Sequence, residues 1–278
     1  MRVSAPAKIN LHLEVLGQRG DGFHGLETVF QTLALSDELE VELTPGGEGI
    51  TLTCSDSSIP ADASNLAWKA AAAVLARRPG SGSVTVRLTK HIPHGAGLGG
   101  GSSDAAAVLL ALNAQLRTHH STALTPAELA AIALELGSDV PFFLRGGTAH
   151  ATGRGEELTA LPDLPPTVVT LLMPPVQLPT PAVFRALTAD ERGPRAARGA
   201  TWAAALVATP TLLLHNRLTA AAERCCPAVG ELLAWLRTQN VPHLMSGSGA
   251  ACFVLGDVDP PPGIRVWRTT TSPGPQRL

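Results

Sequence analysis

The chain has 278 residues, of which 45% are hydrophobic and 16% charged, and its 21 basic and 23 acidic side chains give a formal net charge of −2. This apolar content excludes a disordered chain, and the near-zero charge excludes a general electrostatic attraction to nucleic acid or to an anionic membrane. The length suits one large domain or two domains of about 100 to 150 residues.

The N-terminal residues MRVSAPAKINLHLEV place a lysine and a glutamate inside the apolar stretch, which is unlike a signal peptide. No window approaches the roughly 18 apolar residues of a membrane span. The four cysteines lack the spacing of a metal site. We therefore expect a soluble cytoplasmic protein without a membrane or nucleic-acid partner.

The first part of the chain predicts strands and helices in succession. Residues 2–16 alternate between apolar and polar side chains, which is typical of a half-buried strand. A turn follows at residues 17–22, and further strands are predicted over residues 27–33, 37–43, 49–54 and 83–88. Helices are predicted over residues 65–77, 104–116 and 125–136, and Thr125 to Glu128 have the form of a capping box.

The second part of the chain is marked by prolines between residues 161 and 181, around a short apolar run at 167–173 that predicts a strand. Residues 210–240 are largely helical in pattern, and strands are predicted over 251–255 and, at a sheet edge, near 265–270. We expect a mixed α/β (α+β) protein of two successive domains, residues 1–158 and residues 159–278.

A glycine-rich loop precedes the predicted helix at residue 104. Five of the seven residues from 95 to 101 are glycines, which let successive backbone N–H groups turn inward and form an anion site with the following helix N-terminus. A flexible connection without a ligand is the alternative, but it needs fewer glycines. The candidate phosphate-binding residues are Pro93, His94, Gly95, Ala96, Gly97, Leu98, Gly99, Gly100, Gly101, Ser102 and Ser103.

Two other phosphate motifs fit less well. The Walker A pattern is absent, since none of the three lysines follows a glycine. The pattern GxGxxG is present at Gly95, Gly97 and Gly100, but the acidic residue expected about 20 positions later is missing, because residues 116–122 contain no acid and the next one after them is Glu128. A nicotinamide-dependent oxidoreductase is therefore only a weak alternative.

Three segments together resemble the motifs of the GHMP small-molecule kinases: Pro6–Leu11, Pro93–Ser103 and Ser246–Ala250. Within that superfamily the chain resembles the 4-diphosphocytidyl-2-C-methyl-D-erythritol kinases of non-mevalonate isoprenoid biosynthesis. The segments that carry this closer resemblance are Gly20–His24, Glu27–Phe30, Gly137–Phe142 and Pro179–Phe184. The resemblance implies a two-domain GHMP fold with the active site between the domains. It also implies transfer of a phosphoryl group from Mg-ATP to the 2-hydroxyl of a small molecule that carries a cytidine diphosphate group.

The resemblance assigns catalysis to Lys8 and Asp139. Asp139 would accept the proton of the substrate hydroxyl, and Lys8 would stabilise negative charge on that carboxylate and near the transferred phosphoryl group. The alternative from the residues alone is that Asp139 caps the helix before Pro141 and that Lys8 is a solvated strand residue.

The resemblance also indicates a substrate pocket. His24 and Phe184 would enclose the cytosine, Asn10 and Thr180 would add polar contacts, and Phe30 would line the erythritol side. The family usually has tyrosine where this chain has Phe23, and the chain contains no tyrosine, so Phe23 offers ring packing only. Ordinary core or turn positions are the alternative for these rings.

Gly247 and Gly249 would support the phosphate loop from a second turn. Mg²⁺ would arrive with ATP, with Ser103 contributing an oxygen, whereas Asp104 is expected to cap a helix rather than to bind metal. A GHMP kinase for another alcohol, such as homoserine or mevalonate, is the nearest rival, and a nucleotide-binding module without catalysis is a rival of another class. We expect a monomer or a homodimer.

Overall fold

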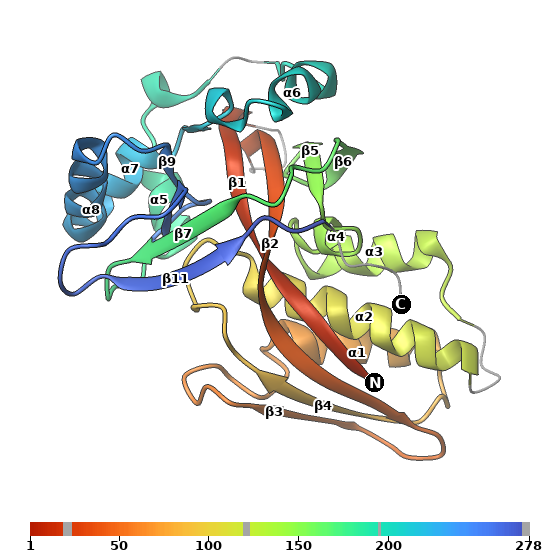
Figure 1. Ribbon diagram of the computed structural model, residues 1–278. Coiled ribbons are helices and arrows are strands. Elements are labelled where there is room, and N and C mark those ends of the chain that lie inside the picture. The colour runs from red at the N-terminus through yellow and green to blue at the C-terminus, as the bar shows by residue number, and fades with distance from the viewer. Residues whose placement is uncertain (19–23, 119–122, 194–195, 274–278) are drawn as a thin grey trace. The chain divides into compact units, whose positions relative to one another are not determined.

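The computed structural model describes residues 1–18, 24–118, 123–193 and 196–273. The chain forms two compact units (Figure 1), each assembled from separated stretches. The first unit comprises residues 1–7, 35–92 and 99–145, and the second comprises residues 8–34, 93–98 and 146–278. These units are interleaved along the chain, unlike the two successive domains expected from the sequence. The expected domain boundary after residue 158 stays a prediction.

The structure has the mixed α/β composition that the sequence predicts. The strands are β1 (Arg2–Gln18), β2 (His24–Thr44), β3 (Ile50–Cys54), β4 (Ser83–Thr89), β5 (Thr148–Thr152), β6 (Glu157–Ala160), β7 (Val168–Met173), β8 (His215–Asn216), β9 (His243–Met245), β10 (Cys252–Leu255) and β11 (Arg265–Thr270). The α-helices are α1 (Leu66–Arg77), α2 (Gly100–Thr118), α3 (Pro126–Leu136), α4 (Val140–Phe143), α5 (Thr180–Ala186), α6 (Ala200–Val207), α7 (Thr219–Cys225) and α8 (Pro227–Thr238). Short 3₁₀ turns are η1 (Ala189–Glu191) and η2 (Pro210–Leu212).

In the first unit, the second half of β2 pairs antiparallel with β4, and β3 pairs parallel with β4. Helix α1 packs against this part of the sheet and against α2 (Figure 1). The alanines on the inner face of α1 are fully buried, which lets α1 approach its neighbours closely.

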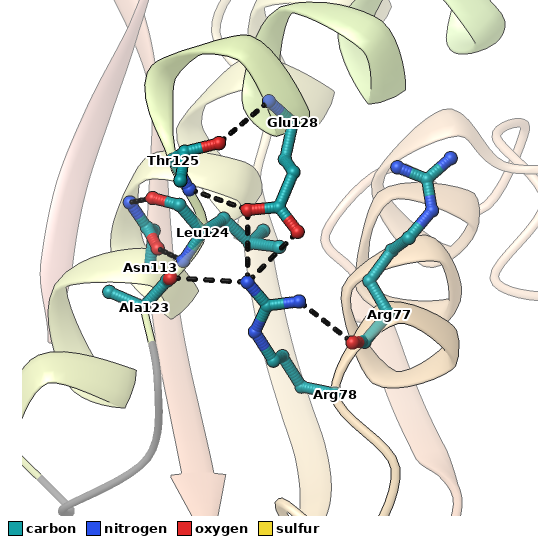
Figure 2. Close-up of polar contacts among 7 residues, drawn as sticks. All are labelled: Arg77, Arg78, Asn113, Ala123, Leu124, Thr125 and Glu128. Carbon is teal, nitrogen blue, oxygen red and sulfur yellow. Dashed lines mark hydrogen bonds and ion pairs between the residues drawn. The ribbon is translucent and has the colours of Figure 1, made fainter.

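The predicted capping box at the start of α3 is present (Figure 2). The Thr125 hydroxyl accepts the N–H of Glu128 at 3.2 Å, and the Glu128 carboxylate accepts the N–H of Thr125 at 2.8 Å. Arg78, at the C-cap of α1, donates to both carboxylate oxygens of Glu128 at 3.0 Å. The cap therefore also ties α1 to α3.

Two predicted boundaries were wrong. The strands expected over residues 27–33 and 37–43 are one continuous strand, because residues 34–36 contain no glycine, proline or positive φ angle that would interrupt β2. Helix α2 begins at Gly100 rather than at residue 104, so the serines at its start lie inside the helix.

In the second unit, β8 pairs parallel with β1, and β5 pairs antiparallel with the first half of β2 and with β6. A separate sheet has the strand order β11-β7-β10-β9, so the predicted edge position of β11 is confirmed. An apolar core joins β1, β7 and β10 to helices α5, α7 and α8. None of the helices in the described part of the chain is both long and apolar enough to cross a membrane.

Candidate active site

Lys8 lies on β1 in a run of consecutive buried residues, 7–15, and its side chain is itself buried. Its ammonium donates to Asn10 Oδ1 at 2.7 Å and lies 5.4 Å from the centre of the Phe30 ring. That distance is within the range of a cation–π contact. Lys8 is therefore held in place inside the second unit, beside the Phe30 ring, and the expected role of Phe30 in lining the erythritol side stays a prediction.

Asn10 is held in turn by β2. Its Nδ2 donates to the Thr28 hydroxyl at 2.8 Å, and that hydroxyl donates to the carbonyl of His12 at 2.6 Å. Both ends of the Asn10 amide are thus engaged within the protein, with the oxygen toward Lys8. This chain of hydrogen bonds fixes the orientation of the amide and gives Lys8 an acceptor where burial would otherwise disfavour its charge.

The turn of the glycine loop around Gly97 lies against the motif at residues 246–250. Gly97 has a φ of 73°, and a Cβ there would lie 2.3 Å from the Ser246 carbonyl oxygen. The Ser246 hydroxyl donates to the Gly97 carbonyl at 3.0 Å, and Ala251 N–H donates to the Ala96 carbonyl at 3.2 Å. Only glycine fits this crossing of two backbones.

The second glycine turn also approaches Lys8. Gly247 has a φ of 56°, and a Cβ added there would lie 3.4 Å from Lys8 Nζ and 3.1 Å from the Gly97 carbonyl oxygen. Gly249 also has a positive φ. The supporting position that the sequence predicts for Gly247 and Gly249 thus fits the close packing of the two turns.

Sequence reasoning missed the residue that holds this second turn. Asn216 on β8 donates through Nδ2 to the carbonyls of Met245 and Gly247 at 2.8 and 2.7 Å, and accepts the N–H of Leu218 at 2.9 Å. Asn216 lies on a two-residue strand inside a region predicted to be largely helical, so the sequence pattern did not indicate its role. Only its distant pairing with β1 identifies its place.

In the first unit, the glycine loop ends on α2. Ser103 is buried in the first turn of α2, and its hydroxyl has no hydrogen-bond partner among the described residues. Asp104 does not cap the helix as expected. Its Oδ2 instead accepts a hydrogen bond from Lys90 Nζ at 2.8 Å. Burial, only partly opposed by the Lys90 charge, raises the pKa of the Asp104 carboxyl to about 7.

Asp139 lies in the first unit, immediately before α4, and is half-buried. Its side chain makes no capping hydrogen bond to that helix, within the part of the chain that the structure describes. The Asp139 side chain therefore does not act as the helix cap that the alternative interpretation expects.

His24 and Phe184 lie together in the second unit, with ring centres 5.7 Å apart and planes tilted by 33°. His24 Nε2 is buried and has no hydrogen-bond partner among the described residues. Burial, together with the nearby Arg192 charge, lowers the pKa of His24, so this ring is neutral at pH 7. The Thr180 hydroxyl, at the start of the helix that carries Phe184, lies 2.7 Å from the Ser248 hydroxyl.

The second unit brings together most of the predicted site, and the first unit holds the rest. Phe23 lies outside the described residues. The second unit holds Lys8, Asn10, His24, Phe30, Pro93 to Leu98, Thr180, Phe184, Gly247 and Gly249, and the first unit holds Gly99 to Ser103 and Asp139. Within the loop, the His94 side chain and Gly95 are exposed.

Residues 65–147 match the family described as GHMP kinases N terminal domain. The 4-diphosphocytidyl-2-C-methyl-D-erythritol kinase of Geobacter sulfurreducens is 38% identical over 256 residues, which are 92% of this chain and 89% of the relative. A crystal structure of a 4-(cytidine 5'-diphospho)-2C-methyl-D-erythritol kinase is 37% identical, with a TM-score of 0.81 over 99% of this chain and 100% of that one. The homoserine kinase of Cytophaga hutchinsonii is 19% identical, with a TM-score of 0.70 over 99% of this chain and 96% of that one, and shares the fold alone. The chain therefore belongs to the family of 4-diphosphocytidyl-2-C-methyl-D-erythritol kinases within the GHMP kinases.

Proposed function

We propose that the chain transfers the γ-phosphoryl group of ATP to the 2-hydroxyl of 4-diphosphocytidyl-2-C-methyl-D-erythritol. The observation that carries this proposal is 38% identity over 92% of the chain to a kinase named for that substrate. The positions of Lys8, the Gly97 turn and the motif at residues 246–250, packed together in one unit, support it.

The donor nucleotide is bound by its phosphates at the glycine loop. Residues 95–99 supply backbone N–H groups, and the N-terminus of the 19-residue helix α2 adds a favourable dipole for an anion. The Gly97 turn is fixed by the neighbouring backbone before any ligand arrives, so little ordering is needed on binding.

The chemical step is an in-line displacement. The substrate hydroxyl oxygen attacks the γ-phosphorus, the bond from that phosphorus to the β,γ-bridging oxygen breaks, and ADP leaves. Asp139 accepts the hydroxyl proton, and Lys8 stabilises the charge that spreads over the transferred group. Asn10 acts through Lys8 in this proposal, because its carbonyl oxygen holds the ammonium at 2.7 Å.

The acceptor is recognised through its cytosine by His24 and Phe184. A base stacked between two rings needs their centres about 7 Å apart, so these rings, now 5.7 Å apart, separate slightly when the base enters. His24 Nε2, buried without a partner among the described residues, is available to the polar edge of the ligand. Thr180 adds a hydroxyl beside them.

The residues of the loop fit a magnesium ion that enters with ATP. Mg²⁺ takes oxygen ligands and usually keeps several waters while it binds substrate phosphates. The buried Ser103 hydroxyl is an oxygen of this kind, whereas Asp104 is engaged by Lys90. Bound there, the ion would neutralise phosphate charge and polarise the γ-phosphoryl group.

Phosphorus NMR of the protein with Mg-ATP and the diphosphocytidyl methylerythritol substrate tests donor and acceptor in one spectrum. A new phosphomonoester signal that grows together with ADP is the expected result. Asp139→Asn should lower the rate by about 100-fold or more, because an amide cannot take the proton. Near-full turnover by this variant would contradict the role of Asp139.

The rivals give different spectra. A kinase for homoserine or mevalonate would leave the diphosphocytidyl substrate unchanged and phosphorylate its own alcohol. A binding module without catalysis would bind ATP and produce no ADP, and an oxidoreductase would bind NAD. Any of these outcomes would replace the proposed function.

A further inference from the structure

Three charged side chains lie buried together in the first unit, and the chemical step described above gives them no part. The Lys90 side chain is 7% exposed, and those of Asp37 and Asp104 are 0% and 4% exposed. Lys90 Nζ donates to Asp37 Oδ2 and, at 2.8 Å, to Asp104 Oδ2. Burying three charges carries a desolvation cost that the contacts must offset.

The three residues come from three separate segments of the first unit: β2, the residues that follow β4, and α2. Asp37 is on β2, and its Oδ1 accepts the backbone N–H groups of His91 at 2.6 Å and Ile92 at 2.8 Å. These residues lead directly into the loop, which begins at Pro93. Asp104 is on α2, one turn after the helix begins at Gly100, where the loop has ended. The cluster therefore ties residues 90–92, which enter the loop, to residues 99–104, which leave it.

Lys90 also touches the start of the helix. A Cβ added to Gly100 would lie 3.3 Å from Lys90 Nζ and 3.2 Å from Ile92 Cγ2. The backbone that leaves the loop thus packs on the side chains that enter it. The separation of the two ends of the loop is set by this contact and by the two ion pairs.

We propose that Asp37, Lys90 and Asp104 are positioning residues that close the base of the glycine loop and so set its affinity for nucleotide phosphates. This inference rests on the proposed function in one respect: it takes a nucleoside triphosphate as the ligand of the loop. None of the three needs to touch the nucleotide, because they act through the backbone of residues 91–92 and 100.

The three residues differ in how replaceable they are. Lys90 lies between two buried carboxyl groups, so its loss removes the donor that joins Asp37 to Asp104. Asp37 accepts three hydrogen bonds, and an amide nitrogen in its place would face the ammonium. Asp104 accepts one, and its Oδ1 has no partner among the described residues. Asparagine at position 104 keeps an acceptor for Lys90 and removes the excess negative charge.

The test is calorimetric titration of the full-length variants Lys90→Met, Asp37→Asn and Asp104→Asn with a non-hydrolysable ATP analogue. We expect Lys90→Met to raise the Kd about tenfold or more and Asp37→Asn to raise it by the next largest factor. The Kd of Asp104→Asn should stay within about threefold of the parental value. Turnover should show the same order in the KM for ATP, with the KM for the acceptor unchanged. If Lys90→Met does not fold, the comparison of the Kd of Asp37→Asn with that of Asp104→Asn tests the proposal.

Glu128→Gln is the matched control. It weakens an ion pair of the same unit, with Arg78 at 3.0 Å, which joins α1 to α3 and is drawn in Figure 2. We expect it to lower the unfolding temperature while the Kd for the analogue stays at the parental value. A selective change in nucleotide affinity is thereby separated from a general loss of stability.

Parental affinity in both Lys90→Met and Asp37→Asn would overturn the inference, as would an Asp104→Asn variant as impaired as Lys90→Met. Equal rises in the KM for both substrates would also overturn it. The binding titration needs no acceptor, so a parent protein that binds the analogue but phosphorylates nothing would end the proposed function alone. A parent protein that does not bind the analogue would end both.

Discussion

At the scale of single residues, the arrangement of Lys8 depends on a side chain that does not react. The ammonium of Lys8 is buried, and Asn10 gives it an acceptor at 2.7 Å, while Thr28 keeps the amide from turning over. A lysine on a flexible stem gains catalytic value only when its position is fixed before the reaction. The hydrogen-bond chain from β2 provides that fixation.

Asn10→Ala should therefore impair catalysis through Lys8. We expect kcat to fall about 10-fold to 100-fold, with a loss of stability of about 1 kcal/mol from the missing hydrogen bonds. Steady-state kinetics of Asn10→Ala, Lys8→Met and the double variant measure the dependence. If Asn10 acts through Lys8, the double variant is no slower than Lys8→Met alone.

An additive loss in the double variant would instead mean that Asn10 contacts the substrate independently, as the sequence suggests. The sequence places Asn10 beside Lys8 on one strand but cannot show which polar groups of β2 meet it. Thr28 follows Asn10 by 18 positions, and that contact exists only once β1 and β2 are paired. The sequence did not predict the roles of side chains whose partners are distant in the chain. Asn216 and Lys90 are the main examples.

At the scale of elements, the two glycine turns are matched to each other. Gly95 and Gly97 both have positive φ angles, of 67° and 73°. Among the described residues, a Cβ at Gly95 would meet only the Gln177 side chain, at 3.8 Å, whereas a Cβ at Gly97 would lie 2.3 Å from the Ser246 carbonyl oxygen. The two positions therefore separate the effect of backbone conformation from the effect of close approach.

Gly97→Ala should be much more damaging than Gly95→Ala. We expect about 1 kcal/mol of destabilisation for Gly95→Ala, from the left-handed conformation alone, and about 3 kcal/mol or more for Gly97→Ala, because backbone must move. Urea denaturation measures both, and the Kd for an ATP analogue should rise mainly in Gly97→Ala. Equal effects of the two substitutions would show that the crossing with residues 246–250 does not constrain the loop.

Elements with local signals were predicted well. The strand over residues 2–16 and the capping box at Thr125 were predicted from neighbours in sequence, and both are present. The strand is not half-buried as expected, because residues 7–15 are buried on both of its faces. The start of α2 was missed because glycine and serine are poor helix formers. At this start Gly100 packs closely on Lys90 and Ile92, whose side chains would lie 3.3 and 3.2 Å from an added Cβ, a contact between residues that the sequence pattern does not reveal.

At the scale of the whole molecule, the composition shows that the chain can form a core. It does not show which residues belong to which compact unit. Strands β1 and β2 each contribute residues to both compact units, which no change in composition along the sequence could reveal. The same folding buries polar side chains of these strands. His12 on β1 is 1% exposed, and its Nε2 has no partner in the described part of the chain.

This burial makes the stability of the protein sensitive to acid. Burial, with the nearby His215 charge, lowers the pKa of His12 from 6.5 to about 4. Between those values the unfolded chain binds a proton that folded His12 does not, so the free energy of unfolding falls as the pH falls from 6.5 toward 4. For one such histidine the loss is at most about 1.4 kcal/mol per pH unit. The pKa values of His24 and His215 are also lowered, chiefly by burial, and act in the same direction.

His12→Phe should flatten this dependence. The phenyl ring can keep the edge contact that His12 makes with Trp202, at 4.9 Å between ring centres, but it takes up no proton in the unfolded chain. Urea denaturation at intervals from pH 7.5 to 5 should show a slope of unfolding free energy against pH that is smaller by about 1 kcal/mol per unit below pH 6.5. An unchanged slope in His12→Phe would mean that His12 takes up its proton in the folded protein, and that the core around β1 admits a charge.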